Sequence, residues 1–202
     1  MHDGWGGPEL LTTYSIERQP IGWRNTRLGV ACAARKDGWE IPVDINADTP
    51  EADARRRALG AHVEVDDLQE YATIGVQLGE RYVSPIVRAN ADDAPSADPW
   101  DRYLPSDQAG GRAPHFFLPD GRSLYDALGE GFVLLAFAGV GSEALEQAAL
   151  KRGVPLTVIR LADRPSDYRR ALVLIRPDHH IAWSGDTLPS DPLGLVDQVR
   201  GA

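Results

Sequence analysis

The feature that most constrains the fold of this chain is an unbroken apolar run at residues 132–137, FVLLAF, which lies between Gly131 and Gly139. Six consecutive apolar side chains leave no polar face toward water, so a strand made of them must be buried on both faces. Such a strand needs neighbouring strands and covering layers on either side. The run therefore predicts an α/β domain in the C-terminal half.

The residues around this run alternate between strand and helix patterns. Strands are predicted at 115–118, 156–160, 171–175 and 180–183, and helices at 123–128, 142–152 and 191–200. Ser142 is placed to cap the middle helix, and Gly153 to end it. Residues 176–179, RPDH, predict a hairpin turn between the last two strands. The expected fold is a mixed sheet flanked by helices.

The N-terminal half is expected to be mainly helical. Apolar residues recur near a period of 3.6 from residue 8 to about 36, and Pro20 is expected to kink this helix. A second helix is predicted to begin at Thr49, with Pro50 in its first position, and to stop at Gly60. A further short helix is predicted at 66–72.

A stretch rich in Pro, Asp, Ser and Gly at residues 91–111 predicts a linker. The expected organisation is a helical region at 1–90, the linker at 91–111 and an α/β domain at 112–202. The acidic excess supports this division, because residues 1–110 carry 11 Lys and Arg against 19 Asp and Glu, whereas residues 111–202 carry 10 against 11.

Three segments carry a resemblance to a known family. Residues 6–20, GGPELLTTYSIERQP, resemble the segment "GPxLLxxYxxERxP" that follows the flavin domain in FAD-dependent aromatic hydroxylases of the p-hydroxybenzoate hydroxylase type. Residues 74–82 are similar to the "LGIQLGYRY" stretch of the same family, with Glu80 in the place of an aromatic residue. Residues 111–126 resemble "GxRAPHxxLxDGRSLYD", which opens the C-terminal domain in the polyketide and phenol branches. The resemblance implies that 112–202 form a thioredoxin-like domain.

The flavin fingerprint of that family is missing from the chain. A G-x-G-x-x-G turn lets the backbone approach a pyrophosphate at a helix N-terminus, and no such pattern occurs. FAD is therefore implied for the parent family, and no cofactor is expected to bind this chain alone. The expected partner is either a chain that carries the flavin domain or a second copy in a homo-oligomer, and an aromatic small molecule is the expected ligand.

Redox and metal chemistry lack the residues that they require. The turn where a thioredoxin-like domain carries its cysteines reads Gly139-Val140-Gly141-Ser142, and the single cysteine, Cys32, is interpreted as a packing residue. The adjacent His179 and His180 of the expected hairpin point to opposite faces, so no metal site is expected.

One histidine remains a weak catalytic candidate. His115 lies in the "RAPH" segment, where the resemblance implies a role in seating that segment, and a general base is the alternative. No G-x-S-x-G elbow marks a nucleophilic serine. The five tryptophans are interpreted mainly as packing residues, with an aromatic-ligand cleft as the alternative.

Charge and composition exclude other classes. A net charge of −9 argues against nucleic acid or an anionic membrane as a partner. The N-terminus shows no signal peptide, and no apolar run is long enough to span a bilayer. A cytoplasmic protein is expected.

Three hypotheses follow for the function. The first is an accessory or truncated C-terminal part of a FAD-dependent, polyketide-type monooxygenase, with a structural or assembly role. The second is a flavin-independent cyclase, isomerase or hydrolase that acts on an aromatic polyketide-like substrate. The third is a pure binding module.

A titration with FAD tests whether the chain holds a flavin by itself. We expect neither quenching of flavin fluorescence nor a shift of the flavin absorbance spectrum, because the glycine-rich pyrophosphate turn is missing. Tight binding with a shifted spectrum would show a flavin site of a different kind and would contradict the first hypothesis.

Overall fold

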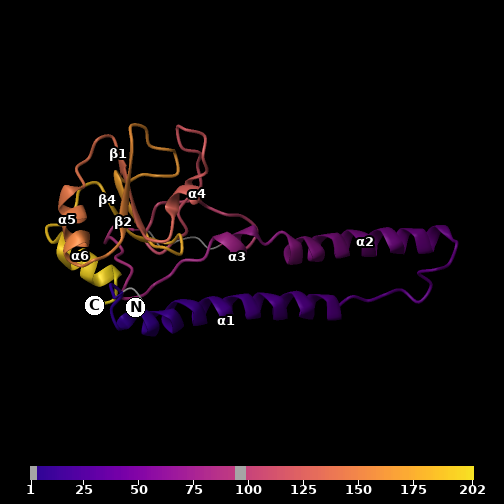
Figure 1. Ribbon diagram of the computed structural model, residues 1–202. Coiled ribbons are helices and arrows are strands. Elements are labelled where there is room, and N and C mark those ends of the chain that lie inside the picture. The colour runs from indigo at the N-terminus through magenta and orange to yellow at the C-terminus, as the bar shows by residue number, and fades with distance from the viewer. Residues whose placement is uncertain (1–3, 94–98) are drawn as a thin grey trace.

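The computed structural model describes residues 4–93 and 99–202. A mixed sheet lies at the centre of its C-terminal half (Figure 1). Its strands are β1 (Phe132–Phe137), β2 (Leu156–Leu161), β3 (Leu172–Ile175) and β4 (Ile181–Gly185), in the order β2-β1-β3-β4. Strand β1 pairs with β2 in parallel, and the pairs β1–β3 and β3–β4 are antiparallel. The predicted mixed sheet is confirmed.

Strand β1 is buried along its whole length, as its apolar sequence predicts. Phe132, Leu134 and Ala136 belong to the cluster that α5 (Glu143–Lys151) and α6 (Pro192–Val199) cover. The alternate residues Val133, Leu135 and Phe137 pack on the other face, beneath α4 (Leu124–Leu128). We call residues 112–202 the sheet region.

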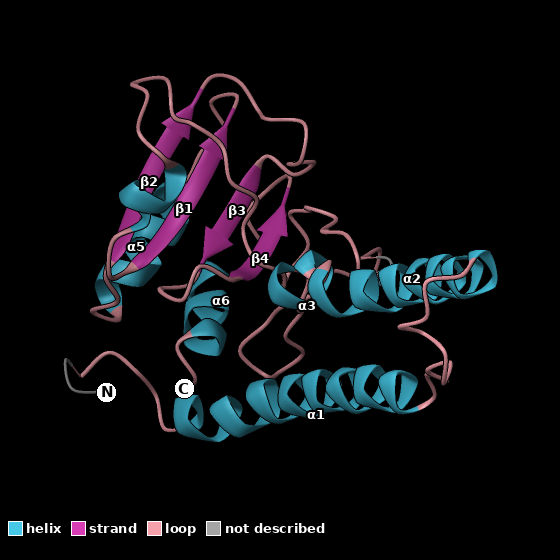
Figure 2. Cartoon of the chain, turned by 90° about the vertical axis from the view of Figure 1, so that its right-hand side faces the viewer, coloured by secondary structure: helices cyan, strands magenta, loops and turns pink. Residues whose placement is uncertain are grey.

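The N-terminal half forms an elongated pair of helices beside the sheet region. Helix α1 (Glu9–Asp37) and helix α2 (Pro50–Tyr71) run side by side away from the sheet, and the short helix α3 (Ile74–Leu78) leads back to it (Figures 1 and 2). Thr49 caps α2 through a hydrogen bond from the Ala52 amide, as its sequence predicts. We call residues 9–78 the helical arm.

Helix α2 is longer than predicted. It passes through Gly60, and the helix predicted at 66–72 is its second half. One internal glycine costs a helix only about 1 kcal/mol, and the alanine, arginine and leucine residues before it favour helix. Pro20 likewise lies inside α1, which continues to Asp37.

The strand predicted at 115–118 is wrong. Only an isolated bridge between Phe117 and Ser123 forms there. Pro114 and Pro119 flank the segment and have no N–H group to donate, so a regular ladder cannot extend through it.

The segment before the sheet region covers the free edge of β4. Ile181 exchanges backbone hydrogen bonds with Gly110 (2.7 Å) and Gly111 (2.9 Å), and Arg88 N donates to Ala182 O (2.8 Å). The buried Asp107 carboxylate accepts the amides of Arg169 and Arg170, each at 2.6 Å. Part of the predicted linker, residues 94–98, lies outside the described residues.

The two ends of the described chain hold each other. Gly7 N donates to Arg200 O (2.7 Å), and Glu9 N donates to Gly201 O (3.1 Å). Trp5 packs edge-on against Phe132, with ring centroids 5.8 Å apart. The start of α1 is therefore attached to the end of α6, next to the sheet (Figure 1).

A pair of glycine substitutions tests this attachment. Gly7→Ala places a Cβ 2.0 Å from Gly201 O, so we expect a loss of more than about 1 kcal/mol in the free energy of unfolding. Gly22→Ala is the control, because nothing lies within 4 Å of its new Cβ and alanine favours a helix interior by up to about 1 kcal/mol. Urea denaturation measures both, and equal stability of the two variants would contradict the attachment.

Candidate functional site

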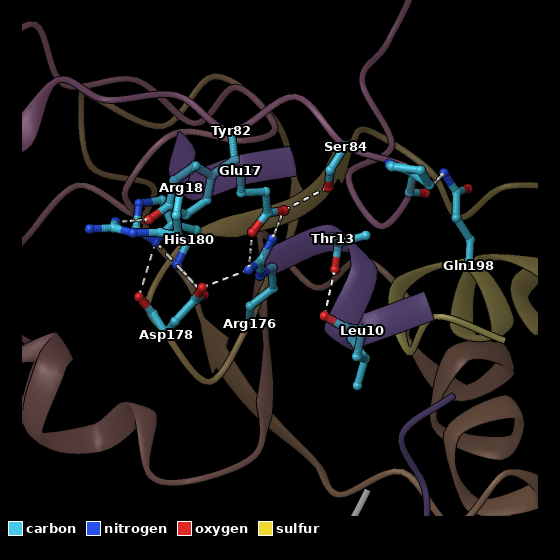
Figure 3. A network of polar contacts seen from close by, with 11 residues as sticks. Leu10, Thr13, Glu17, Arg18, Tyr82, Ser84, Arg176, Asp178, His180 and Gln198 are labelled. Atoms are coloured by element: carbon cyan, nitrogen blue, oxygen red, sulfur yellow. Dashed lines mark hydrogen bonds and ion pairs between the residues drawn. The ribbon is translucent and has the colours of Figure 1, made fainter. Parts of the chain in front are cut away.

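A buried ion pair joins the helical arm to the sheet region. The Arg176 guanidinium, just after β3, binds both carboxylate oxygens of Glu17 from α1, with Nη1–Oε1 at 2.6 Å and Nη2–Oε2 at 2.8 Å (Figure 3). The side chains are only 5% and 10% exposed, respectively, for Glu17 and Arg176. Two parallel hydrogen bonds between planar groups fix the orientation as well as the distance.

Further polar groups complete this pair. Ser84 Oγ donates to Glu17 Oε1 at 2.6 Å, and Arg176 Nη2 also binds Asp178 Oδ2 at 2.6 Å. Burial opposes ionisation of Asp178, but hydrogen bonds from His180 and the charge of Arg176 outweigh it and lower the pKa of Asp178 to about 2. The buried charges are thus neutralised within the cluster.

Two aromatic rings lie against the same cluster. Tyr82 stacks on His180 with ring centroids 4.3 Å apart, and the Arg176 guanidinium lies 5.6 Å from the centre of the Tyr82 ring. Arg18, next to Glu17 in α1, donates to the Tyr82 hydroxyl. His180 Nδ1 lies 3.1 Å from the backbone oxygen of Asp178.

We call this cluster the arm joint; its members are Glu17, Arg18, Tyr82, Ser84, Arg176, Asp178 and His180. They come from α1, from the segment after the arm and from the β3–β4 turn (Figure 3). Glu17, Arg176 and Asp178 are each in contact with an opposite charge, and the Tyr82 and His180 rings are buried. The arrangement suits a structural link between α1 and the sheet region rather than a site of proton transfer.

The predicted catalytic candidate, His115, lies elsewhere. Its Nε2 is 2.9 Å from Ser123 Oγ, and its ring contacts Phe117 edge-on, with centroids 4.9 Å apart. Ser123 Oγ also accepts the Tyr125 amide at the start of α4. These contacts hold the segment before α4 in place, and a general-base role for His115 stays a prediction.

His179, Tyr125 and Arg112 form a second set of contacts beside His115. Tyr125 OH donates to Ala113 O (2.7 Å) and accepts from Arg112 Nε (3.0 Å), and the Tyr125 ring stacks on His179 at 5.2 Å. His179 and His180 therefore contact different rings. Within residues 4–93 and 99–202, no group of three or more His, Cys, Asp or Glu side chains converges on a metal site.

Among the serines and tryptophans, Ser142 and Trp183 are buried in the fold and Trp23 is exposed. Ser142 is fully buried, and its Oγ donates to Glu146 at 2.6 Å instead of capping α5. Trp183 is buried in the core, whereas Trp23 on α1 is 60% exposed beside a groove of about 470 Å³ with Pro20 and Arg24. Trp23 is thus an exception to the packing interpretation.

The described residues do not fit FAD. The turn before α5 is the nearest equivalent of a pyrophosphate loop, and Glu143 and Glu146 occupy the first turn of that helix. The Glu143 carboxylate would repel a pyrophosphate at a position where backbone amides would otherwise attract it.

Comparisons with known proteins agree with these observations. Residues 106–200 match the family described as "Aromatic-ring hydroxylase, C-terminal". A FAD-dependent monooxygenase of Emericella nidulans is 32% identical over 93% of this chain and 32% of its own length. A phenol 2-monooxygenase of Pseudomonas sp. is 29% identical over 98% of this chain and 39% of its own length.

Solved structures give the same correspondence in three dimensions. RebC-10x, described as native and K252c-bound, superposes with a TM-score of 0.88 at 38% identity, over 98% of this chain and 38% of that one. The chain corresponds to the C-terminal part of FAD-dependent aromatic-ring hydroxylases. It spans about a third of the length of these relatives.

The hydroxylase motifs now have physical explanations. The "ER" of the first motif, Glu17 and Arg18, supplies the α1 side of the arm joint. In the "RAPH" and "SLYD" motif, His115 pairs with Ser123, and Tyr125 binds the backbone of Ala113. Within residues 4–93 and 99–202, no helix is both long enough and apolar enough to cross a membrane.

The arm joint was not predicted from the sequence, although the sequence contains one signal of it. Glu17 lies between Thr13 and Ile21 at intervals of four residues, on the stripe of α1 that is buried. A charged residue at a buried helical position requires a partner. The partner, Arg176, is 159 residues away, and no local pattern identifies it.

Substitutions in the arm joint test its contribution to stability. Glu17→Ala leaves Arg176 buried without its main counter-charge, so we expect a loss of about 3–5 kcal/mol in the free energy of unfolding. The double variant Glu17→Leu with Arg176→Met is expected to lose less, because it leaves no buried charge unpaired. Urea denaturation of wild type, single and double variants measures this. A double variant that is less stable by the sum of the single losses would contradict the interpretation.

Proposed function

We propose that this chain is an accessory, non-catalytic part of a FAD-dependent aromatic-ring monooxygenase of the polyketide type, and that its helical arm docks on the flavin-binding body. That body is present either on a partner chain or on a longer form of the same chain. The observation that carries the proposal is the exposed apolar surface of the arm.

Helix α1 is covered along one narrow stripe only. Thr13, Glu17, Ile21 and Cys32 are its buried residues. A second stripe at intervals of seven residues, Ile16, Trp23 and Val30, is 41%, 60% and 64% exposed. A helix with an uncovered apolar stripe is typical of an element that packs against another protein surface.

Helix α2 supports the same conclusion. Its last turns expose Val65, Leu68 and Tyr71, and only Ala52 and Asp66 are buried among its described side chains. The two helices contact each other but enclose no core of their own, because the buried hydrophobic clusters lie in the sheet region. The apolar side chains of the arm therefore need another protein surface to cover them.

The relatives support the flavin-binding body as that cover. The printed names of the similar proteins describe FAD-dependent monooxygenases, and roughly two thirds of their length has no counterpart in this chain. The arm joint holds α1 at a set angle to the sheet region, which would position the apolar stripe for that missing body. The sheet region would act as a rigid support.

Two finer points belong to the same proposal. The strand order β2-β1-β3-β4, with helices α5 and α6 together on one face, supports the thioredoxin-like interpretation of the sheet region.

Relatives whose names include tetracenomycin monooxygenase-dioxygenases support an aromatic polyketide-like substrate for the assembled enzyme. A flavin-independent enzyme has no observation in its favour among the described residues.

A chimera with RebC tests the docking. The portion of RebC that superposes on this chain is replaced by the chain, and bound FAD is measured by absorbance after purification. We expect the chimera to retain FAD and to unfold in one transition. Ile16→Asp together with Trp23→Glu places two charges in the docked stripe, so we expect separate transitions and at least a tenfold loss of bound FAD, about 1.4 kcal/mol.

The matched control is Val43→Glu, which alters a fully exposed apolar residue between α1 and α2. It is expected to leave FAD content and unfolding unchanged. If the stripe variant behaves like this control, the arm does not dock through Ile16 and Trp23.

A further inference from the structure

The β3–β4 turn, residues 176–180, holds two adjacent histidines against two different parts of the molecule. His180 stacks on Tyr82 within the arm joint, with ring centroids 4.3 Å apart. His179 stacks on Tyr125 of α4, with centroids 5.2 Å apart and ring planes only 7° from parallel. The turn is thus fixed by two ring contacts, one in the arm joint and one on α4.

The backbone of this turn is strained at His179. Its φ angle of 69° lies in the left-handed region, which glycine adopts freely and other residues adopt rarely. Such a conformation persists only where the surroundings hold it. His179 N donates to Arg176 O at 3.0 Å, and His179 O accepts from Ala113 N at 3.0 Å. The stack on Tyr125 is the remaining contact, and it depends on the charge of the imidazole ring.

The surroundings of the His179 ring favour its uncharged form. The Arg112 guanidinium already lies 4.7 Å from the centre of the Tyr125 ring, and Arg112 Nε donates to the Tyr125 hydroxyl at 3.0 Å. A protonated His179 would bring a second cation to the same ring. Burial lowers the pKa of His179, the charges of Arg112 and His180 act in the same direction, and Asp178 opposes them.

Asp178 offers little compensation for an extra charge, because its carboxylate is already bound. Oδ2 accepts from Arg176 Nη2 at 2.6 Å, and Oδ1 accepts from the His180 amide at 3.2 Å. The pKa of Asp178 is about 2, so it stays ionised throughout the range in which a histidine titrates. His115 also contacts the Tyr125 ring, with centroids 5.4 Å apart, and adds a further positive charge there when it is protonated.

The same turn supplies three members of the arm joint. Arg176 binds Glu17 of α1, Asp178 binds Arg176, and His180 packs on the ring from the segment after the arm (Figure 3). His179 lies between Asp178 and His180 in the chain. A change of backbone conformation at His179 therefore displaces the groups that hold α1.

We propose that the β3–β4 turn is a pH-sensitive switch for the helical arm, in which protonation of His179 weakens the arm joint. In the neutral form, the His179 ring stays on Tyr125 and the turn presents Arg176 to Glu17. In the charged form, the ring leaves Tyr125 for solvent, the left-handed backbone relaxes, and Arg176 loses its fixed orientation. Among the described residues, the buried clusters of the sheet contain no histidine, so the sheet stays folded while the start of α1 opens more often.

The direction of the effect with pH follows from the charge. When the turn opens, His179 regains its ordinary pKa of about 6.5, which is higher than its pKa in the closed turn. The closed turn is fully favoured above about pH 6.5, and this preference is lost as the pH falls below that value. The arm is thus held at neutral pH and released by mild acid.

Hydrogen exchange followed by mass spectrometry tests the switch on the full chain. Peptides from the first half of α1 are expected to lose protection about threefold or more between about pH 7.5 and pH 5, after correction for the intrinsic exchange rate. Peptides from β1 are expected to keep their protection. An NMR titration of the His179 ring is expected to give a midpoint below about 6.5.

Two variants separate this switch from other effects of acid. His179→Asn removes the titrating ring and keeps a residue that tolerates a left-handed backbone, so it is expected to abolish the pH dependence of α1 protection. His62→Gln is the histidine control on α2, where the side chain is 63% exposed, and it is expected to keep the wild-type dependence.

Three results would overturn the proposal. They are equal protection of α1 at both pH values, a His179 midpoint at or above about 6.5, and a His179→Asn variant with the wild-type pH dependence. All of these measurements use this chain alone, so their outcome does not depend on whether the arm docks on a flavin-binding body.

Discussion

The bidentate contact between Glu17 and Arg176 determines how the two halves of this molecule are related. It is the buried charged link between α1 and the sheet region, with Ser84 and Asp178 bound to its free positions. Buried charges of this kind contribute little net stability when paired but cost several kcal/mol when one partner is removed. Their main effect is therefore to permit one orientation of α1 and to penalise others.

That orientation has a consequence for the surface. Once Thr13, Glu17 and Ile21 face the sheet region, Ile16, Trp23 and Val30 must face solvent, because helical geometry separates the two stripes by about a quarter to a third of a turn. Under the proposed docking, the flavin-binding body would cover this apolar stripe, which is exposed in the chain described here.

Local sequence patterns predicted that a helix or strand exists better than they predicted the residues at which it begins and ends. The six apolar residues of β1 predicted a strand buried on both faces, because the run is short, lies between glycines and has no polar face. At Gly60 and at residues 115–118 the local pattern gave a wrong prediction. A glycine was tolerated inside α2 because good helix formers surround it, and an apparent strand failed because prolines at 114 and 119 cannot donate.

The sequence alone determined the α/β class, the family resemblance and the lack of a flavin turn, because these depend on composition, periodicity and short motifs that act locally. Only the tertiary structure decided the partner of Glu17, the surroundings of His115 and which edge of the sheet stays open. These depend on pairing between residues far apart along the chain, up to 159 positions for Glu17 and Arg176, and such pairing leaves no periodic trace in one sequence.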